Sequence, residues 1–272
     1  MIHFYILDFK EGVFYMKDRV QLISMGTIMI LTIVLIINVF AARTKMETKA
    51  SEGESEVVVK KETIEIEEPV FAASENSYFD DALFIGDSRT VGLCEYGTLG
   101  NADYFASTGM SIYELWNETL SVENVGKVTL DELLGIKQYG KIYIMLGINE
   151  LGYNVDQTVA KNEMTIEKIR EKQSEAIIYI CGNLHVTKAR SDKGDYINNE
   201  KIDVFNQRLK ELTDTEGIYY IDVNEEFDDE SGNLRSECTG DDVHVYAKYY
   251  QDWCKWLCEN TVQRGKEQHD TK

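Results

Sequence analysis

The feature that most constrains the fold is a regular alternation of two hydrophobic patterns between residues 78 and 262. Short runs are apolar at nearly every position, as strands buried on both faces are, and longer segments between them carry apolar residues at helical spacing. Alternating strands and helices predict a parallel sheet covered by helices on both faces, a three-layer α/β/α domain. The predicted strands are residues 82–85, 102–106, 141–146, 176–181 and 217–223. The predicted helices are residues 130–139, 156–173, 199–213 and 246–262.

Polar segments follow the predicted strands where chemistry is expected. In open parallel sheets, ligands bind outside the carboxyl ends of the strands, so the residues directly after each strand are the candidates. Segments 86–90, 106–111 and 147–150 follow the first three strands, and segment 240–244 precedes the last helix. The residues of interest in these segments are Ser88, Gly109, Asn149, Asp241 and His244.

Ser88, His244 and Asp241 are the residue types that form a nucleophilic catalytic site. A serine hydroxyl becomes a nucleophile when a nearby base removes its proton, and acyl transfer also needs donors for the developing oxyanion. Ser88 stands at a predicted strand-to-helix turn, where the helix N-terminus favours negative charge. Of the four histidines, only His244 has a carboxylate three residues before it. That spacing closes into one turn, in which Asp241 can hold the imidazole Nδ1–H.

In order and spacing, the four segments resemble the sequence blocks of the SGNH (GDSL-type) hydrolase family, and the resemblance spans essentially all of residues 78–262. Each segment alone is also typical of an ordinary turn or cap, whereas their joint occurrence at successive strand ends favours catalysis. Two positions depart from the usual family pattern: Arg89 stands where many members have leucine, and Glu150 where aspartate is usual. Asp242 lies at the wrong spacing from His244 for that pattern.

The resemblance implies a flavodoxin-like fold with a five-stranded parallel sheet, and it implies a role for each of five residues. Ser88 would be the nucleophile, His244 the base, and Asp241 the acid that orients the imidazole. The oxyanion hole would be formed by the backbone N–H groups of Ser88 and Gly109 and by the side-chain amide of Asn149.

A run of 21 residues without a charge, residues 22–42, lies before this region. As a helix it would span about 31 Å, the hydrocarbon thickness of a bilayer, so it predicts a transmembrane helix. Basic residues flank the run on both sides, and we expect the N-terminus inside because the preceding segment is short and the following acidic region is large. Residues 39–41 resemble a signal-peptidase site, but the run exceeds the usual length of about 7–15 residues in a signal sequence.

The chain is therefore predicted to have the following organisation. Residues 1–21 are a short N-terminal segment, and residues 22–42 are the transmembrane helix. Residues 43–77 are a flexible acidic tether, rich in Glu, Lys, Ser and Thr. Residues 78–262 form the SGNH hydrolase-like domain, and residues 263–272 are a polar tail.

Charge and composition exclude several classes of partner. The chain has 48 Asp+Glu against 28 Lys+Arg, and its net charge of −20 repels phosphate backbones, so no nucleic-acid partner is expected. One histidine beside two aspartates lacks further ligands at usable spacing, so neither a metal nor another cofactor is predicted. The five cysteines contain no C-x-x-C pair and are interpreted as structural.

Together these inferences predict a single-pass serine esterase of the cell membrane with its C-terminal domain outside the cytoplasm. The tether favours acyl esters, above all acetyl esters, of envelope or extracellular carbohydrate as the substrate. Two alternatives stay open: an O-acyltransferase that modifies a cell-envelope polymer with a membrane partner as acyl donor, and a non-catalytic surface-binding module on the same fold.

Other side chains near the motif segments bear on the substrate. Arg89 either contacts an anionic or carbohydrate substrate or forms a structural ion pair with one of the many acids. Four aromatic side chains either stack on sugar rings or pack in the core: Tyr96, Tyr113, Trp116 and Tyr153.

Overall fold

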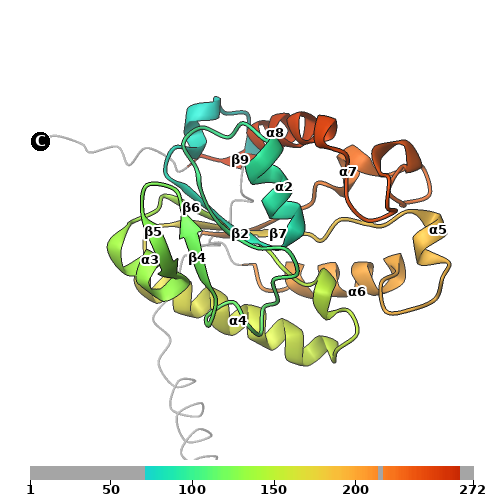
Figure 1. Ribbon diagram of the computed structural model, residues 1–272, viewed down its shortest axis with the longest axis horizontal. Coiled ribbons are helices and arrows are strands. Elements are labelled where there is room, and N and C mark those ends of the chain that lie inside the picture. Colours follow the sequence, from blue (N-terminus) through green and yellow to red (C-terminus); the bar gives the residue numbers. More distant parts are fainter. Residues whose placement is uncertain (1–70, 214–216, 264–272) are drawn as a thin grey trace, which may run out of the picture. The chain divides into compact units, whose positions relative to one another are not determined.

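The computed structural model describes residues 71–213 and 217–263 (Figure 1). The N-terminal segment, the predicted transmembrane helix at 22–42 and most of the predicted tether and tail lie outside the described residues. Within the described part of the chain, no helix combines the length and the apolar character of a membrane span.

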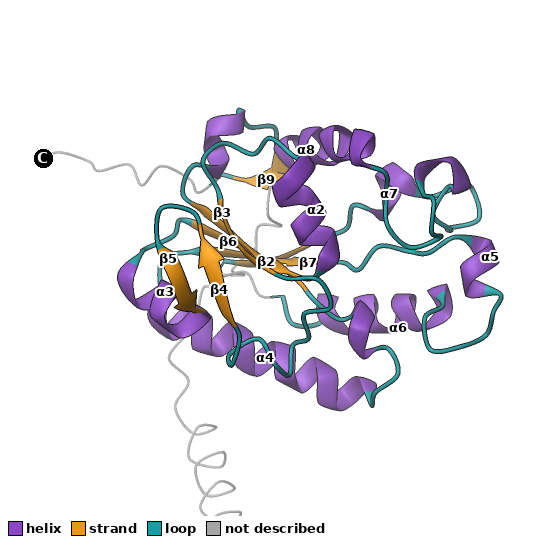
Figure 2. Cartoon of the chain, in the orientation of Figure 1, coloured by secondary structure: helices purple, strands orange, loops and turns teal. Residues whose placement is uncertain are grey.

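Five parallel strands form the central sheet (Figure 2). They are β2 (Ala82–Gly86), β3 (Asp103–Ala106), β6 (Lys141–Met145), β7 (Ile177–Cys181) and β8 (Ile218–Ile221). Their order across the sheet is β3-β2-β6-β7-β8, with every neighbouring pair parallel. The predicted α/β fold with a five-stranded parallel sheet is thus confirmed. The segments that follow β3, β2 and β6 consequently begin at three adjacent strands, at the carboxyl end of the sheet.

Helices cover both faces of the sheet, as Figures 1 and 2 show. One face packs against α3 (Leu130–Ile136), α4 (Val155–Lys172) and α6 (Asn199–Lys210). The other face packs against α2 (Ser88–Tyr96), α7 (Asn224–Phe227) and α8 (Tyr250–Glu259). The short helix α5 (Lys188–Ser191) lies in the connection between β7 and α6, and four 3₁₀ turns complete the helical elements among the described residues: η1 (Asn76–Phe79), η2 (Ile148–Glu150), η3 (Ser236–Cys238) and η4 (Ala247–Tyr249).

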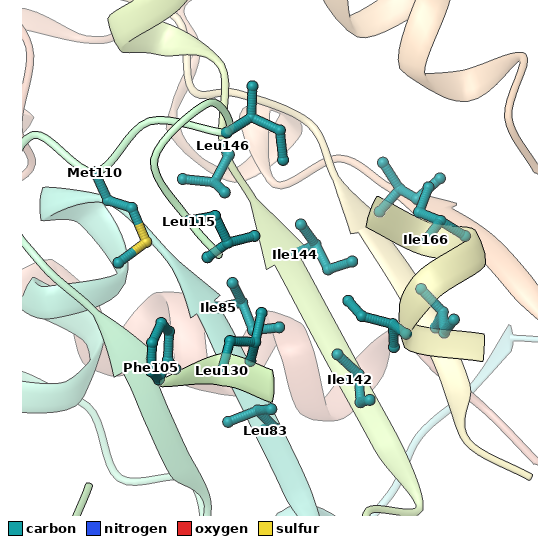
Figure 3. Packing of buried hydrophobic residues seen from close by; sticks show 14 of the residues in the cluster. Leu83, Ile85, Phe105, Met110, Leu115, Leu130, Ile142, Ile144, Leu146 and Ile166 are labelled. Carbon is teal, nitrogen blue, oxygen red and sulfur yellow. The ribbon is translucent and has the colours of Figure 1, made fainter. Parts of the chain in front are cut away.

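Successive side chains of each strand enter two separate hydrophobic cores, because side chains alternate across a sheet. Leu83 and Ile85 of β2 point into the core beneath α3, α4 and α6, part of which Figure 3 shows. Phe84 enters the opposite core, where it stacks on Tyr143, which in turn stacks on Tyr179, with ring centroids 4.5 and 4.4 Å apart. These three rings are register partners on adjacent strands, so the aromatic row helps to fix the pairing that sets the strand ends.

Several short elements differ from the sequence prediction. The last predicted helix, 246–262, begins as η4 and α8 and ends at Glu259, and the next residues form β9 (Thr261–Val262). That strand pairs antiparallel with β1 (Phe71–Ala72), so the folded domain includes residues 71–77, which the sequence analysis placed in the tether. A hairpin of β4 (Thr119–Val122) and β5 (Gly126–Thr129) lies between β3 and α3. β4 and β5 mix polar and apolar residues, and β1 and β9 are only two residues long, so none of them shows the apolar run that predicts the strands of the central sheet.

Candidate active site

Ser88 is the first residue of α2, directly after the tight turn that ends β2. The Asp87 carboxylate caps this helix by accepting a hydrogen bond of 3.0 Å from the Arg89 backbone N–H. Gly86 leaves no room for a side chain, since an added Cβ would lie 2.0 Å from Oγ1 of Thr90 and 2.8 Å from the Met145 carbonyl oxygen. The strand and the helix therefore approach closely, and the half-buried Ser88 hydroxyl is held at the strand end.

The structure brings Ser88, His244 and Asp241 into one hydrogen-bonded row. Oγ of Ser88 lies 2.8 Å from Nε2 of His244, although the residues are 156 positions apart. Nδ1 of His244 lies 2.7 Å from Oδ2 of Asp241. A carboxylate oxygen can only accept, so Nδ1 carries the proton and Nε2 is left to accept from the serine hydroxyl. This is the tautomer that a general base needs.

The Asp241 carboxylate is held by the turn that it begins. Its Oδ1 accepts backbone N–H groups from Val243, at 3.0 Å, and from His244, at 2.8 Å. Partial burial raises the pKa of Asp241, but the backbone and side-chain hydrogen bonds from His244 and the one from Val243 outweigh it, so this pKa lies well below its ordinary value. The acid is therefore ionised throughout the range in which a histidine titrates.

Asp242 points away from His244 and bonds to a different part of the chain. Its carboxylate accepts the Thr187 hydroxyl at 2.8 Å, and its backbone carbonyl accepts the Thr187 N–H at 3.1 Å. Its φ of 73° lies in the left-handed region, which separates its direction from that of Asp241. Of the two adjacent aspartates, only Asp241 contacts the imidazole.

Gly109 and Asn149 follow the strands on either side of β2, in the order that the sequence predicts. Gly109 has a φ of 79°, and an added Cβ would meet nothing within 4 Å, so glycine is favoured here for conformation rather than for space. Among the described residues, the backbone N–H groups of Ser88 and Gly109 have no hydrogen-bond partner. The Asn149 amide donates to the Met110 carbonyl at 3.0 Å, which ties the two loops together and leaves a second N–H on the amide.

Glu150 has a role that the sequence analysis missed. Its side chain is buried, and its Oε1 accepts the backbone N–H of Ile112, just beyond Gly109. Burial raises the pKa of Glu150 above its ordinary value, against the hydrogen bond from Ile112. The Glu150 carboxylate therefore connects the loop that contains Gly109 to the segment that contains Asn149. The only sequence signal was its position, where the family has the shorter aspartate.

Arg89 is buried beneath the site rather than exposed to a substrate. Its side chain is 1% exposed, and Nη2 donates to the Leu184 carbonyl at 3.4 Å. Burial lowers the pKa of Arg89, against the nearby negative charge of Asp87. It forms no ion pair within the described ranges. Neither a substrate contact nor a structural ion pair, the two alternatives that the sequence raised, therefore describes its contacts.

The four aromatic residues near the motif segments have different surroundings. Tyr96 packs on Tyr250, and Trp116 donates to Oγ1 of Thr165 and packs on the core. Tyr113 and Tyr153 contact each other, with ring centroids 5.5 Å apart, and of the four only Tyr153 lines a large pocket. Nowhere in residues 71–213 and 217–263 do three His, Cys, Asp or Glu side chains gather as metal ligands.

Comparisons with known proteins show the family and the fold of the chain. Residues 84–251 match the GDSL-like Lipase/Acylhydrolase family. The chain belongs to this family. This GDSL-type chain is accordingly an ester hydrolase by family, and the matched region runs from β2 into α8, which includes every site residue described above. A search of curated proteins finds no match.

Solved structures resemble this GDSL-type chain in fold. A Streptococcus pneumonia protein described as a platelet activating factor is 24% identical, with a TM-score of 0.52 over 67% of this chain and 87% of that chain. A GDSL-like lipase from Bacteroides thetaiotaomicron is 16% identical, with a TM-score of 0.50 over 65% of this chain and 85% of that chain. An acylhydrolase from Bacteroides fragilis is also 16% identical, with a TM-score of 0.50 over 75% and 95%. At these identities the likeness shows the fold alone.

Proposed function

We propose that this chain hydrolyses acyl esters through Ser88, His244 and Asp241. The observation that carries the proposal is the continuous row of short hydrogen bonds from Oγ of Ser88 through the imidazole to the Asp241 carboxylate. Nε2 of His244 removes the hydroxyl proton as Oγ attacks the ester carbonyl carbon, and it then returns the proton to the leaving alcohol. A water molecule, activated by the same imidazole, cleaves the acyl-enzyme and regenerates Ser88.

The oxyanion of each tetrahedral intermediate would be held by three donors. These are the backbone N–H groups of Ser88 and Gly109 and the free N–H of the Asn149 amide, which follow three adjacent strands. The position of Ser88 at the start of α2 adds the positive end of the helix dipole. Such preorganised donors lower the barrier because the charge develops where they already point.

Replacing the nucleophile tests the proposal. Ser88→Ala should abolish cleavage of p-nitrophenyl acetate with little change in melting temperature, because the hydroxyl lies at a half-buried strand end rather than in either core. Ser121→Ala, at an exposed position of β4, is the matched control and should keep full activity. A serine-directed organophosphonate should label Ser88 alone. Activity that persists in Ser88→Ala, or labelling at another serine, would refute the assignment and favour a binding module.

We propose carbohydrate acetyl esters as the natural substrate, on the basis of the acidic tether and the membrane segment that the sequence predicts. The same acyl-enzyme can also pass its acyl group to a sugar hydroxyl, so the O-acyltransferase alternative uses the same residues. Incubation with an acetyl donor and an acceptor glycan distinguishes the two: a hydrolase releases acetate at a rate independent of the glycan, and a transferase acetylates the glycan.

We further propose that the chain is anchored in the cell membrane through residues 22–42, with the hydrolase domain outside the cytoplasm. The support is the uncharged run and the acidic, polar segment that follows it. Protease added to intact cells should then release a soluble domain by cutting between residues 43 and 70. Full protection of the domain would place it in the cytoplasm and remove the argument for an envelope substrate.

A further inference from the structure

We infer that a pocket beside Asn149 binds the sugar rings of a neutral acylated oligosaccharide while its ester is at Ser88, an inference that rests on the proposed function. The pocket has a volume of about 440 Å³ and lies between the η2–α4 segment and α6. The lining residues on which the inference depends are Glu150, Tyr153, Asn154, Asn198, Glu200 and Lys201.

The pocket wall is continuous with the loops that hold the oxyanion donors. Glu150, which lines the pocket, directly follows Asn149, and its carboxylate accepts a hydrogen bond from the backbone N–H of Ile112 in the Gly109 loop. Tyr153 packs against Tyr113, three residues after Met110, with the ring centroids 5.5 Å apart. The pocket wall and two of the oxyanion donors therefore belong to the same pair of loops.

The volume is too large for the acyl group that the proposed function favours. An acetyl group has two carbon atoms, whereas 440 Å³ lies in the range of pockets that hold whole small molecules, roughly 300–1,000 Å³. The pocket therefore holds either the alcohol part of the ester or a long acyl chain, and the chemistry of the lining decides between them.

The lining matches a sugar better than an alkyl chain. The lining is mixed: Phe205 and Leu151 are buried at the base, while at the rim Val204 exposes apolar surface and Asn154, Glu200 and Lys201 expose polar groups. A sugar presents apolar C–H faces as well as hydroxyls, so it can contact both kinds of surface. An alkyl chain would remove water from these rim groups without replacing their hydrogen bonds. Sugar hydroxyls replace them. Glu150 is buried, and the opposite charges of the exposed side chains Glu200 and Lys201 cancel, which favours a neutral glycan.

Tyr153 supplies the aromatic surface on which a sugar ring can stack. It is 65% exposed although it is one of the largest apolar side chains of this region. Its ring contacts that of Tyr113, whose hydroxyl lies 3.1 Å from Oγ1 of Thr158 at the edge of the pocket, so the Tyr153 ring is supported on one side. An exposed aromatic ring beside hydrogen-bonding side chains offers apolar surface on which a sugar ring can stack.

The test compares three esters with variants of the full chain. The substrates are p-nitrophenyl acetate, which is too small to extend along the pocket, p-nitrophenyl decanoate, and an acetylated xylo-oligosaccharide as the neutral glycan ester. Tyr153→Ala should raise KM for the glycan ester about 3–10-fold more than it changes KM for p-nitrophenyl acetate, the loss of one aromatic contact that only the glycan ester makes. Tyr153→Phe should restore the wild-type KM, and Tyr96→Ala, which removes another exposed tyrosine away from the pocket, should change nothing.

The outcomes separate this inference from the proposed function. If Tyr153→Ala leaves KM for the glycan ester unchanged, or the wild type cleaves p-nitrophenyl acetate but no glycan ester, the sugar pocket is wrong and Ser88 chemistry stands. If Tyr153→Ala raises KM for the decanoate ester instead, the pocket holds the acyl chain and the inference is overturned. If the wild type cleaves no ester, the proposed function itself fails.

Discussion

Replacing Asp241 by asparagine tests how His244 is oriented. Oδ1 of Asp241 accepts from the Thr239 hydroxyl and from the backbone N–H groups of Val243 and His244, and Oδ2 accepts from the imidazole Nδ1–H. Because the groups around Oδ1 are donors, asparagine must keep its carbonyl oxygen there and turn its NH₂ toward Nδ1. Nδ1 then has to accept, so the ring proton moves to Nε2, the atom that faces Ser88.

In that tautomer the imidazole cannot remove the serine proton. We expect kcat to fall about 10²–10⁴-fold, which corresponds to roughly 2.7–5.4 kcal/mol in activation free energy. The His244 and Asp241 side chains are 41% and 58% exposed, so water partly replaces the lost interaction. The loss should therefore lie in the lower half of this range.

The adjacent variant Asp242→Asn is the matched control. Asparagine keeps an acceptor for the Thr187 hydroxyl and tolerates the φ of 73°, so kcat should stay within about threefold of wild type. The assay is kcat and KM for p-nitrophenyl acetate, with melting temperatures to confirm that both variants fold.

Two results would refute this reasoning. If Asp242→Asn caused the large loss and Asp241→Asn the small one, the turn would be built differently and Asp242 would be the acid of the triad. Equal small losses would mean that His244 and Ser88 work as a dyad, with the imidazole oriented by another group.

Two further variants test the loop glycine Gly109 and the buried histidine His185. Gly109→Ala, where φ is 79°, should cost about 1–2 kcal/mol of backbone strain and move the Gly109 N–H, so kcat should fall about tenfold or more. The control Gly126→Ala, at a φ of 101°, should leave kcat unchanged. His185 bonds Asp228 at 2.7 Å and Asp203 at 2.9 Å. Burial lowers the pKa of His185, but these carboxylates outweigh it and raise the pKa above the unfolded value of about 6.5. The stabilisation of the fold by protonated His185 is thus complete below about pH 6.5 and is lost as the pH rises through the folded pKa. In urea titrations, His185→Gln should lower the free energy of unfolding by about 1–2 kcal/mol at acid pH and by less at alkaline pH. An equal loss at both pH values would contradict this argument.

The sequence by itself determined the features that depend on near neighbours in the chain. Continuous apolar runs locate the five strands within a few residues, because a strand buried on both faces has no polar position. The turn from Asp241 to His244 is equally local, since three residues suffice to bring the carboxylate to Nδ1. The predicted transmembrane helix at 22–42 also rests on local composition alone, and it stays a prediction.

Only the tertiary structure decided which distant groups meet. The 2.8 Å contact between Ser88 and His244 joins residues 156 positions apart, and it exists because the fold brings the segment before α8 to the start of α2. The direction of Asp242 depends on Thr187, and the burial of Arg89 depends on helices packed around it, so neither has a signature in the sequence. The pocket beneath Tyr153 likewise forms between α4 and α6, whose approach is set by packing against a shared core and not by any residue pattern within either helix.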